Sequence, residues 1–102
     1  MRVLSLGPLR EFWERYPDSE AVLRRWDRAA ERAYWERWAE VKITFPQADL
    51  VPMRSGVKME VFNVGGNKFR VVAHVPFRGG WMFIKKVMTH AEYSRDRWKE
   101  EL

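Results

Sequence analysis

The hydrophobic periodicity of the chain changes near residue 56, and this change limits the folds that are open to it. Apolar residues recur with helical spacing before this point, whereas three runs rich in Val, Phe and Ile follow it, at 57–64, 67–75 and 81–88. Gly65-Gly66 separates the first two runs, and a turn ending in Gly79-Gly80 separates the last two. This arrangement is typical of antiparallel hairpins. The C-terminal half is therefore predicted to be a three-stranded antiparallel meander.

The N-terminal half is predicted to consist of a short strand over residues 1–6 and of helices. Three apolar stripes with helical spacing follow the strand, and Pro17 and Pro46 end the first and the third of them. The stripes consist of Leu9, Phe12, Trp13 and Tyr16, then of Leu23, Trp26, Ala30 and Ala33, and finally of Tyr34, Trp38, Val41 and Phe45. Residues 47–56 contain Pro52, Ser55 and Gly56 and are predicted to form a connecting loop.

The length and the end of the chain complete the predicted fold. Thr89 follows the last strand and Glu92 lies three residues later, which is the spacing of a capping box at the start of a short helix. With 102 residues, of which 46% are hydrophobic, the chain fits one domain over residues 1–102. Its predicted class is α+β: a small twisted antiparallel sheet, in which a short N-terminal strand joins the meander, with two to three N-terminal helices on one face and a short C-terminal helix.

Side-chain alternation in the predicted strands separates apolar from basic positions. Successive side chains of a strand point to opposite faces, so an apolar set shares one face: Val71, Ala73, Val75, Met82 and Ile84. We expect the helices to cover this face. Arg70 and Lys85 would then lie on an open, concave face, and Lys58 would join them if its strand has the matching register.

Positive charge is concentrated in the predicted strands. Residues 54–86 carry seven basic side chains and one acid, a net charge of +6, whereas residues 1–51 carry nine of each sign. The seven are Arg54, Lys58, Lys68, Arg70, Arg78, Lys85 and Lys86. A sheet face of one sign, in a chain with a pI of about 9.9, is an electrostatic footprint for a polyanion such as nucleic acid. A solvated basic surface without a partner would have the same composition.

Several other kinds of function find no support in the sequence. There is no cysteine and no cluster of His, Asp and Glu with metal-ligand spacing, so we expect neither a metal nor another cofactor. Gly65-Gly66 precedes a strand rather than a helix and is no phosphate-binding loop, and no Ser nucleophile motif is present. No apolar run approaches the roughly 20 residues of a membrane span, and the N-terminal run is too short for a signal peptide. We therefore expect no membrane association and a cytoplasmic location.

Two blocks in the C-terminal half together resemble the HigB family of toxins from bacterial toxin–antitoxin pairs. They read F-N-x-x-G-N-x-x-R, ending at Arg70, and T-H-x-E-Y, from Thr89 to Tyr93. The likeness is close over residues 58–95 and looser back to residue 1. It implies a RelE-like fold and metal-free cleavage of mRNA on the ribosome. It also implies a HigA-type helix-turn-helix antitoxin as partner, and contact with operator DNA only through the antitoxin complex.

The resemblance also implies roles for individual residues. His90 is expected to act as general acid or base, because histidine titrates near neutral pH. Arg70 and Lys85 would hold the scissile phosphate and stabilise its developing charge, although the family commonly has Arg where Lys85 stands. Tyr93 would stack on a base or donate a proton. The residues expected to bind RNA are Lys58, Lys68, Lys86 and Arg78. Glu92 is expected to cap the helix or orient His90, and His74 to be structural.

Two other readings of the basic sheet stay open at this point. One is a non-catalytic module that binds RNA or DNA, and the other is a protein-interaction domain whose charged face meets an acidic partner. The nuclease and the non-catalytic module share one prediction, which is that nucleic-acid binding weakens steeply as the salt concentration rises. Only the nuclease predicts growth arrest and RNA fragments that bear a 5′-OH.

Overall fold

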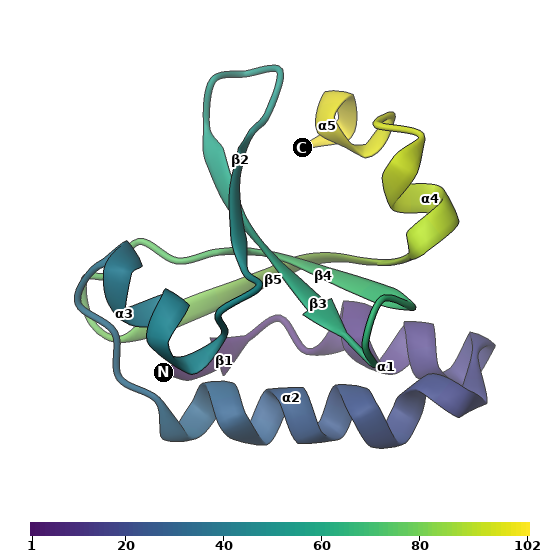
Figure 1. The fold of residues 1–102 in the computed structure, drawn as a ribbon, viewed down its shortest axis with the longest axis horizontal. Helices are drawn as coiled ribbons and strands as arrows, with labels where there is room; N and C mark the ends of the chain where they lie inside the picture. The colour runs from purple at the N-terminus through teal and green to yellow at the C-terminus, as the bar shows by residue number, and fades with distance from the viewer.

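The three predicted strands of the C-terminal half form one sheet with two further strands (Figure 1). The computed structural model describes residues 1–102. Its strands are β1 (Arg2–Leu4), β2 (Asp49–Pro52), β3 (Lys58–Val64), β4 (Phe69–His74) and β5 (Trp81–Thr89). Its helices are α1 (Gly7–Arg15), the 3-10 helix η1 (Pro17–Ser19), α2 (Glu20–Arg32), α3 (Trp38–Thr44), α4 (His90–Ser94) and α5 (Trp98–Glu101). The predicted α+β class is therefore confirmed.

The order of strands across the sheet is β1-β5-β4-β3-β2. The predicted meander is present as β3, β4 and β5, and β1 adds to its edge in parallel with β5. The sheet is therefore mixed, and the prediction of a wholly antiparallel sheet is corrected at β1. The prediction of a loop over residues 47–56 is wrong in part, because β2 forms there and pairs antiparallel with β3. Proline is tolerated in edge strands, where a missing N–H breaks no ladder bond, so Pro52 ends this strand without preventing it.

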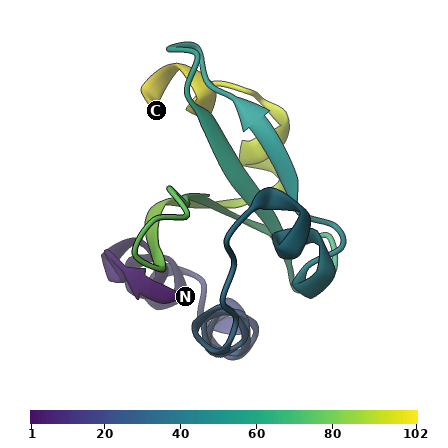
Figure 2. The same cartoon turned by 90° about the vertical axis from the view of Figure 1, so that its left-hand side faces the viewer.

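Helices α1 and α2 cover one face of the sheet, as Figures 1 and 2 both show. The main core lies between these helices and the sheet, and it contains the apolar set predicted from alternation. Phe62 is fully buried at its centre, and its ring centroid lies 5.2 Å from that of Trp26 and 5.3 Å from that of Phe45. The third apolar stripe is corrected at its start, because Tyr34 precedes α3 and is 67% exposed. Its neighbour Trp35 is buried in its place.

The opposite face of the sheet is covered, whereas the sequence pattern predicts an open face. Helices α4 and α5 fold back over it and bury a second apolar cluster, which consists of Met53, Met59, Val61, Val72, Met88 and Trp98. The indole of Trp98 is 2% exposed and donates a hydrogen bond to the carbonyl oxygen of Tyr93 at 3.0 Å. The loop between β2 and β3 closes on the same helices, since Arg54 N donates to Lys99 O at 3.1 Å. The C-terminal segment therefore completes the fold on this side.

A β-bulge in β5 sets which residues face each core. Val72 pairs with Lys86 while Ala73 pairs with Ile84, so Lys85 has no partner on β4. The extra residue shifts the alternation of the strand by one position. Val87 and Lys85 are two residues apart and would share a face in a regular strand, but only Val87 packs against the main core. Met88 points to the other face and joins the second cluster.

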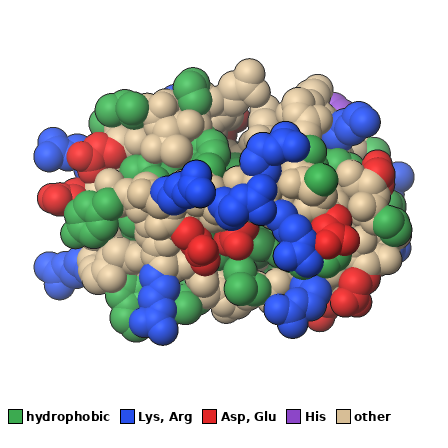
Figure 3. Space-filling model, turned by 90° about the horizontal axis from the view of Figure 1, so that it is seen from below, with side chains coloured by type: hydrophobic (Ala, Val, Ile, Leu, Met, Phe, Trp, Pro, Cys, Tyr) green, Lys and Arg blue, Asp and Glu red, His purple; other side chains and the backbone are tan.

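The helical side of the molecule carries charges of both signs. Figure 3 views it from the side of α1 and α2 and shows Lys and Arg side chains interspersed with Asp and Glu. This distribution agrees with the balanced charge of residues 1–51. None of the helices has the length and apolar character that crossing a bilayer requires.

Glu60 is a buried acid on the face of β3 that carries Phe62. Its side chain is 3% exposed, and Oε2 accepts a hydrogen bond from the backbone N–H of Val75 at 2.9 Å. Burial raises the pKa of the Glu60 carboxyl from its usual 4.5 to about 7, and the hydrogen bond from Val75 only partly opposes this. The folded protein therefore holds a proton on Glu60 at a pH at which the unfolded chain has lost it.

We expect Glu60→Gln to stabilise the protein above neutral pH. Between about pH 4.5 and 7 the folded state binds more protons than the unfolded state, so the wild-type free energy of unfolding falls as pH rises. The fall attributable to Glu60 is about 3 kcal/mol. Glutamine keeps an oxygen for the N–H of Val75 but has no charge, so the variant should lack this component. Urea unfolding at both ends of the pH window measures it, and identical pH dependence in the two proteins would refute the prediction.

Candidate active site

Arg70 and His90 meet where β4 begins and β5 ends. The ladder places Phe69 opposite Thr89, and the backbone N–H of His90 donates to Lys68 O at 2.9 Å. These two contacts bring the first turn of α4 against the start of β4. Arg70 Nη2 consequently lies 3.1 Å from His90 Nδ1. The guanidinium and the imidazole thus meet on the face of the sheet that carries the side chain of Arg70.

Arg70 is held by several protein atoms and is only 5% exposed. Its Nη1 donates to the carbonyl oxygens of Phe69 and Asn67 at 3.1 and 3.3 Å, and Nη2 donates to Asn67 Oδ1 at 2.5 Å. The expectation that Arg70 faces an open hollow is therefore corrected. Asn67, which the sequence analysis did not single out as a site residue, fixes the guanidinium from the turn between β3 and β4. Its position three residues before Arg70 in the F-N-x-x-G-N-x-x-R block is the signal that could have shown this.

The contact with Arg70 determines the tautomer of His90. A guanidinium has N–H donors and no acceptor, so we assign Nδ1 of His90 as the acceptor in this contact. In the neutral ring the proton then lies on Nε2. His90 is an exposed residue, so this second nitrogen is not enclosed by the fold.

Tyr93 lies next to the same guanidinium. The Arg70 Cζ atom is 5.2 Å from the centroid of the Tyr93 ring, and this ring stacks on Trp98 with a centroid distance of 5.2 Å. Burial, and then the negative charge of Asp49, raise the pKa of the Tyr93 phenol above its usual value. The phenol is therefore protonated at neutral pH and can donate a hydrogen bond but cannot act as a base.

Glu92 serves the start of α4, as predicted. Glu92 N donates to Thr89 Oγ1 at 3.2 Å, and Glu92 Oε1 accepts from Thr89 N at 3.1 Å, which makes a complete capping box. The carboxylate is thus used by the backbone of its own helix. Since α4 carries both His90 and Tyr93, the cap fixes the helix from which these two side chains project.

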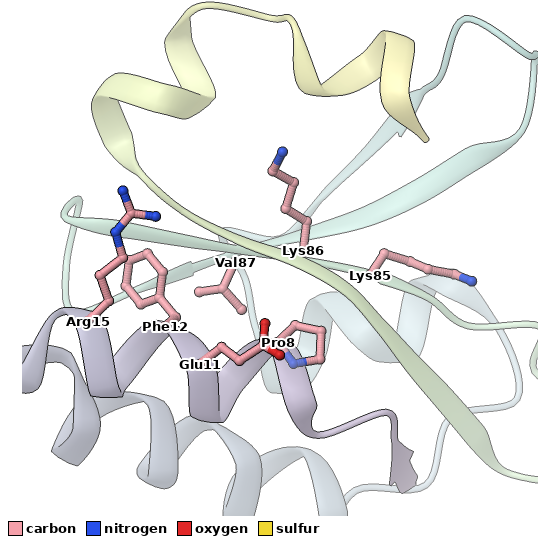
Figure 4. A pocket seen from close by; sticks show the side chains of 7 residues that line it. All are labelled: Pro8, Glu11, Phe12, Arg15, Lys85, Lys86 and Val87. Carbon is pink, nitrogen blue, oxygen red and sulfur yellow. The ribbon is translucent and has the colours of Figure 1, made fainter.

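Lys85 and Lys86 are not part of this cluster. They border a hollow of about 290 Å³ between α1 and β5, whose other lining residues are Pro8, Glu11, Phe12, Arg15 and Val87 (Figure 4). Figure 4 shows the two lysine side chains leaving the strand in different directions. Lys86 Nζ forms an ion pair with Glu101 at 2.7 Å, whereas Lys85 Nζ lies 5.9 Å from the centroid of the Phe83 ring. The expected convergence of Lys85 with Arg70 is thus not found.

The other predicted RNA-binding residues have separate positions. Lys68 lies in the turn before β4, and its carbonyl oxygen accepts from His90, so its backbone borders the site. Lys58 begins β3 and shares the face of Glu60 and Phe62, which is opposite to that of Arg70. Its expected place beside Arg70 is therefore wrong. Arg78 is exposed in the loop before β5, at the far end of that strand from His90.

Comparisons with known proteins identify the family of this chain. Residues 19–96 match the sequence model of the HigB toxin family, which is described as the RelE-like toxic component of a toxin–antitoxin system. The chain belongs to the HigB toxin family. The HigB family resemblance seen in the sequence is thereby confirmed. Membership of a toxin–antitoxin family implies an antitoxin partner.

Named members of the HigB family are similar to this chain along most of its length. The mRNA interferase toxin HigB of Escherichia coli is 34% identical over 93 residues, which cover 91% of this chain and 88% of that protein. The mRNA interferase HigB of Shigella flexneri has the same identity and coverage. An mRNA interferase HigB from a further Escherichia coli strain is 30% identical over 95 residues, covering 93% of this chain and 90% of the relative.

The HigB family match contains the Arg70–His90 cluster but ends before the residue that closes the second core. Arg70, His90 and Tyr93 all lie within residues 19–96, whereas Trp98 follows that range.

No group of three or more His, Asp or Glu side chains is arranged to hold a metal ion.

Proposed function

We propose that the chain is an endoribonuclease that cleaves mRNA, with Arg70, His90 and Tyr93 as its active site. The relatives bear the name mRNA interferase, and the observation that supports the site is the 3.1 Å contact between Arg70 Nη2 and His90 Nδ1. In this proposal the substrate is mRNA on the ribosome, in the cytoplasm, and a HigA-type helix-turn-helix antitoxin neutralises the protein. Operator DNA is then contacted only through the antitoxin complex.

The proposed reaction needs no metal ion or cofactor, because RNA carries its own nucleophile. The 2′-OH attacks the adjacent phosphorus, and the bond from phosphorus to the 5′ oxygen breaks. The products are a 2′,3′-cyclic phosphate and a 5′-OH. Three events have to be assisted during this reaction. A proton leaves the 2′ oxygen, negative charge that builds up on the phosphorane oxygens is stabilised, and the departing 5′ oxygen receives a proton.

Substrate binding would change the state of His90. In the free protein Nδ1 accepts a hydrogen bond from Arg70 and carries no proton. A phosphate oxygen that replaces the imidazole at Nη2 leaves Nδ1 free to carry a proton. His90 then acts as the general acid for the 5′ oxygen. The proton of the 2′-OH passes to a solvent water, because the Tyr93 phenol is protonated and the Glu92 carboxylate is bonded within its own helix cap. Arg70 meanwhile contacts the phosphate, where its charge stabilises the transition state.

Tyr93 and Lys68 would support this arrangement from two sides. The Tyr93 ring lies against the Arg70 guanidinium, and its protonated phenol can donate a hydrogen bond to the substrate. Lys68 lies in the turn whose backbone holds His90, so its ammonium group is available to a neighbouring phosphate.

Mapping of RNA ends in cells tests the proposed function. Expression of the chain should arrest growth, and primer extension on a chosen message should reveal new 5′ ends that need a kinase before ligation, since they carry a 5′-OH. Arg70→Lys should lower cleavage by about 10²-fold or more, because lysine cannot bond the turn and the phosphate together. Arg24→Lys, at an exposed arginine paired with Glu20 on α2, is the matched control. RNA binding without 5′-OH ends would favour the non-catalytic module.

A further inference from the structure

An exposed strip of alternating cations and aromatic rings lies along the outer end of β5. Trp81 and Phe83 are stacked with ring centroids 6.3 Å apart at 23°, and Trp81 is 41% exposed. Arg2 Cζ lies 6.0 Å from the Trp81 ring, and Lys85 Nζ lies 5.9 Å from the Phe83 ring. The sequence of groups is therefore cation, ring, ring, cation. We call Arg2, Trp81, Phe83 and Lys85 the aromatic strip.

The aromatic strip is not needed by either core. On β5 the core side is supplied by Met82 and Ile84, which alternate with the strip residues and are buried under the helices. The second cluster contains neither ring of the strip. Two large apolar side chains therefore remain at the surface without a packing role, and contiguous exposed apolar surface of this kind marks binding sites.

The Trp81 ring is held in place by the turn that precedes β5. Gly79 has φ +77°, and a Cβ atom at this position would overlap the indole nitrogen of Trp81. On the other side, Arg2 pairs with Trp81 in the ladder between β1 and β5, and Arg2 N donates to Gly80 O at 2.6 Å. The platform is thus formed before any ligand arrives, which reduces the entropic cost of binding.

The aromatic strip faces the same side of the sheet as the Arg70–His90 cluster. Phe83 pairs with His74, and His74 shares its face of β4 with Arg70. His74 lies four positions after Arg70 on β4, which is about 13 Å at the usual rise of a strand. Trp98 packs on the middle of this face, and a hollow of about 140 Å³ beside it is bordered by Lys86 of β5 and by Glu92 of α4.

We propose that the aromatic strip binds single-stranded RNA beside the cleavage site, a proposal that rests on the proposed function. Two bases stack on Trp81 and Phe83, and the flanking phosphates contact Arg2 and Lys85. The charge favours this ligand over a protein partner, since every charged side chain of the strip is a cation and each ring lies next to one. Lys85 thereby acts in substrate binding rather than in the chemical step.

Anisotropy of a dye-labelled single-stranded RNA at low salt tests this proposal. All variants are made in a His90→Asn background, so that the RNA stays intact while its affinity is measured. Trp81→Ala should weaken binding by about 5- to 150-fold, and Trp81→Phe should recover part of the loss. Ile43→Ala, which removes an 80% exposed apolar side chain from α3, is the matched control and should bind as the parent does. Lys85→Gln should reduce the salt slope by about one, whereas Arg24→Gln should not.

The outcomes separate this inference from the proposed function. Unchanged affinity in Trp81→Ala, an equal loss in Ile43→Ala, or no binding by the parent would overturn the RNA site. Loss of antitoxin binding in Trp81→Ala with RNA affinity intact would overturn it in favour of a protein-docking surface. If wild type cuts no RNA but Trp81 still controls binding, the aromatic strip stands and the nuclease proposal fails. Thermal unfolding confirms folding of each variant, and Lys85→Gln decides the matter if Trp81→Ala is unfolded.

Discussion

Replacing His90 by alanine is expected to lower the rate of RNA cleavage by about 10²–10⁴-fold, which is the usual contribution of a general acid or base. His90 is exposed, and its ring contacts only Arg70 by hydrogen bonding. The free energy of unfolding should therefore change by less than about 0.5 kcal/mol. Single-turnover cleavage and urea unfolding of the same preparations measure the two effects.

His90→Asn separates proton transfer from the positioning of Arg70. The side-chain oxygen of asparagine can accept the hydrogen bond that Nδ1 accepts now, so the guanidinium keeps its partners. The amide cannot exchange a proton near neutral pH, so this variant should be as inactive as His90→Ala. It should also lose any limb of the pH–rate profile that histidine provides. Retention of most of the wild-type rate would mean that His90 only holds Arg70.

Replacing Phe62 by alanine should cost about 3–5 kcal/mol of the free energy of unfolding. Phe62 is fully buried, and its ring lies within 6.3 Å of the rings of Trp26, Trp35 and Phe45. Truncation would leave a cavity among large rings, which cannot all move to fill it. For a domain whose total stability is of order 5–15 kcal/mol, this loss approaches unfolding.

Phe83→Ala is the matched control for Phe62→Ala. It removes the same ring from a partly exposed position on the other side of the sheet, so its cost should be well under half as large. Urea unfolding monitored by tryptophan fluorescence compares the two variants. Equal losses would show that the cluster around Phe62 is no more important to stability than the exposed face.

The link between fold and site follows from strand pairing. In the ladder Phe62 lies opposite Val71, next to Arg70, and Arg70 lies opposite Met88, two residues before His90. The buried face of β3, β4 and β5 thus fixes the register that brings the guanidinium to the imidazole. A slip of one residue would send Arg70 into the main core and separate the pair.

The meander and the two faces of β4 could be predicted because they depend on local patterns. Paired glycines specify the first hairpin, and alternation of polar and apolar side chains assigns Val71 and Arg70 to opposite faces. The capping box of Thr89 and Glu92 is likewise a matter of spacing within one turn. The resemblance to the HigB family then singled out Arg70, His90 and Tyr93, which the structure brings together.

Other features depend on partners that are distant in the sequence. β2 has four residues and is stabilised only by pairing with β3, so no local pattern shows it. Trp98 belongs to a four-residue helix, and its burial depends on residues from the β2–β3 loop and from β3, β4 and β5. The low exposure of Arg70 follows in part from the same cause, because His90 and Tyr93, which lie against its guanidinium, belong to α4.

By itself, then, the amino-acid sequence determined the class of fold, the family and which residue types face away from the helices. Only the tertiary structure decided that Lys85 lies apart from the Arg70–His90 cluster, because the bulge in β5 arises from pairing with β4. The tertiary structure also decided that Lys58 lies on the face of the sheet opposite to Arg70, since register is a property of two strands. Periodicity is written within a segment, whereas register, bulges and burial are set by the free energy of contacts between segments.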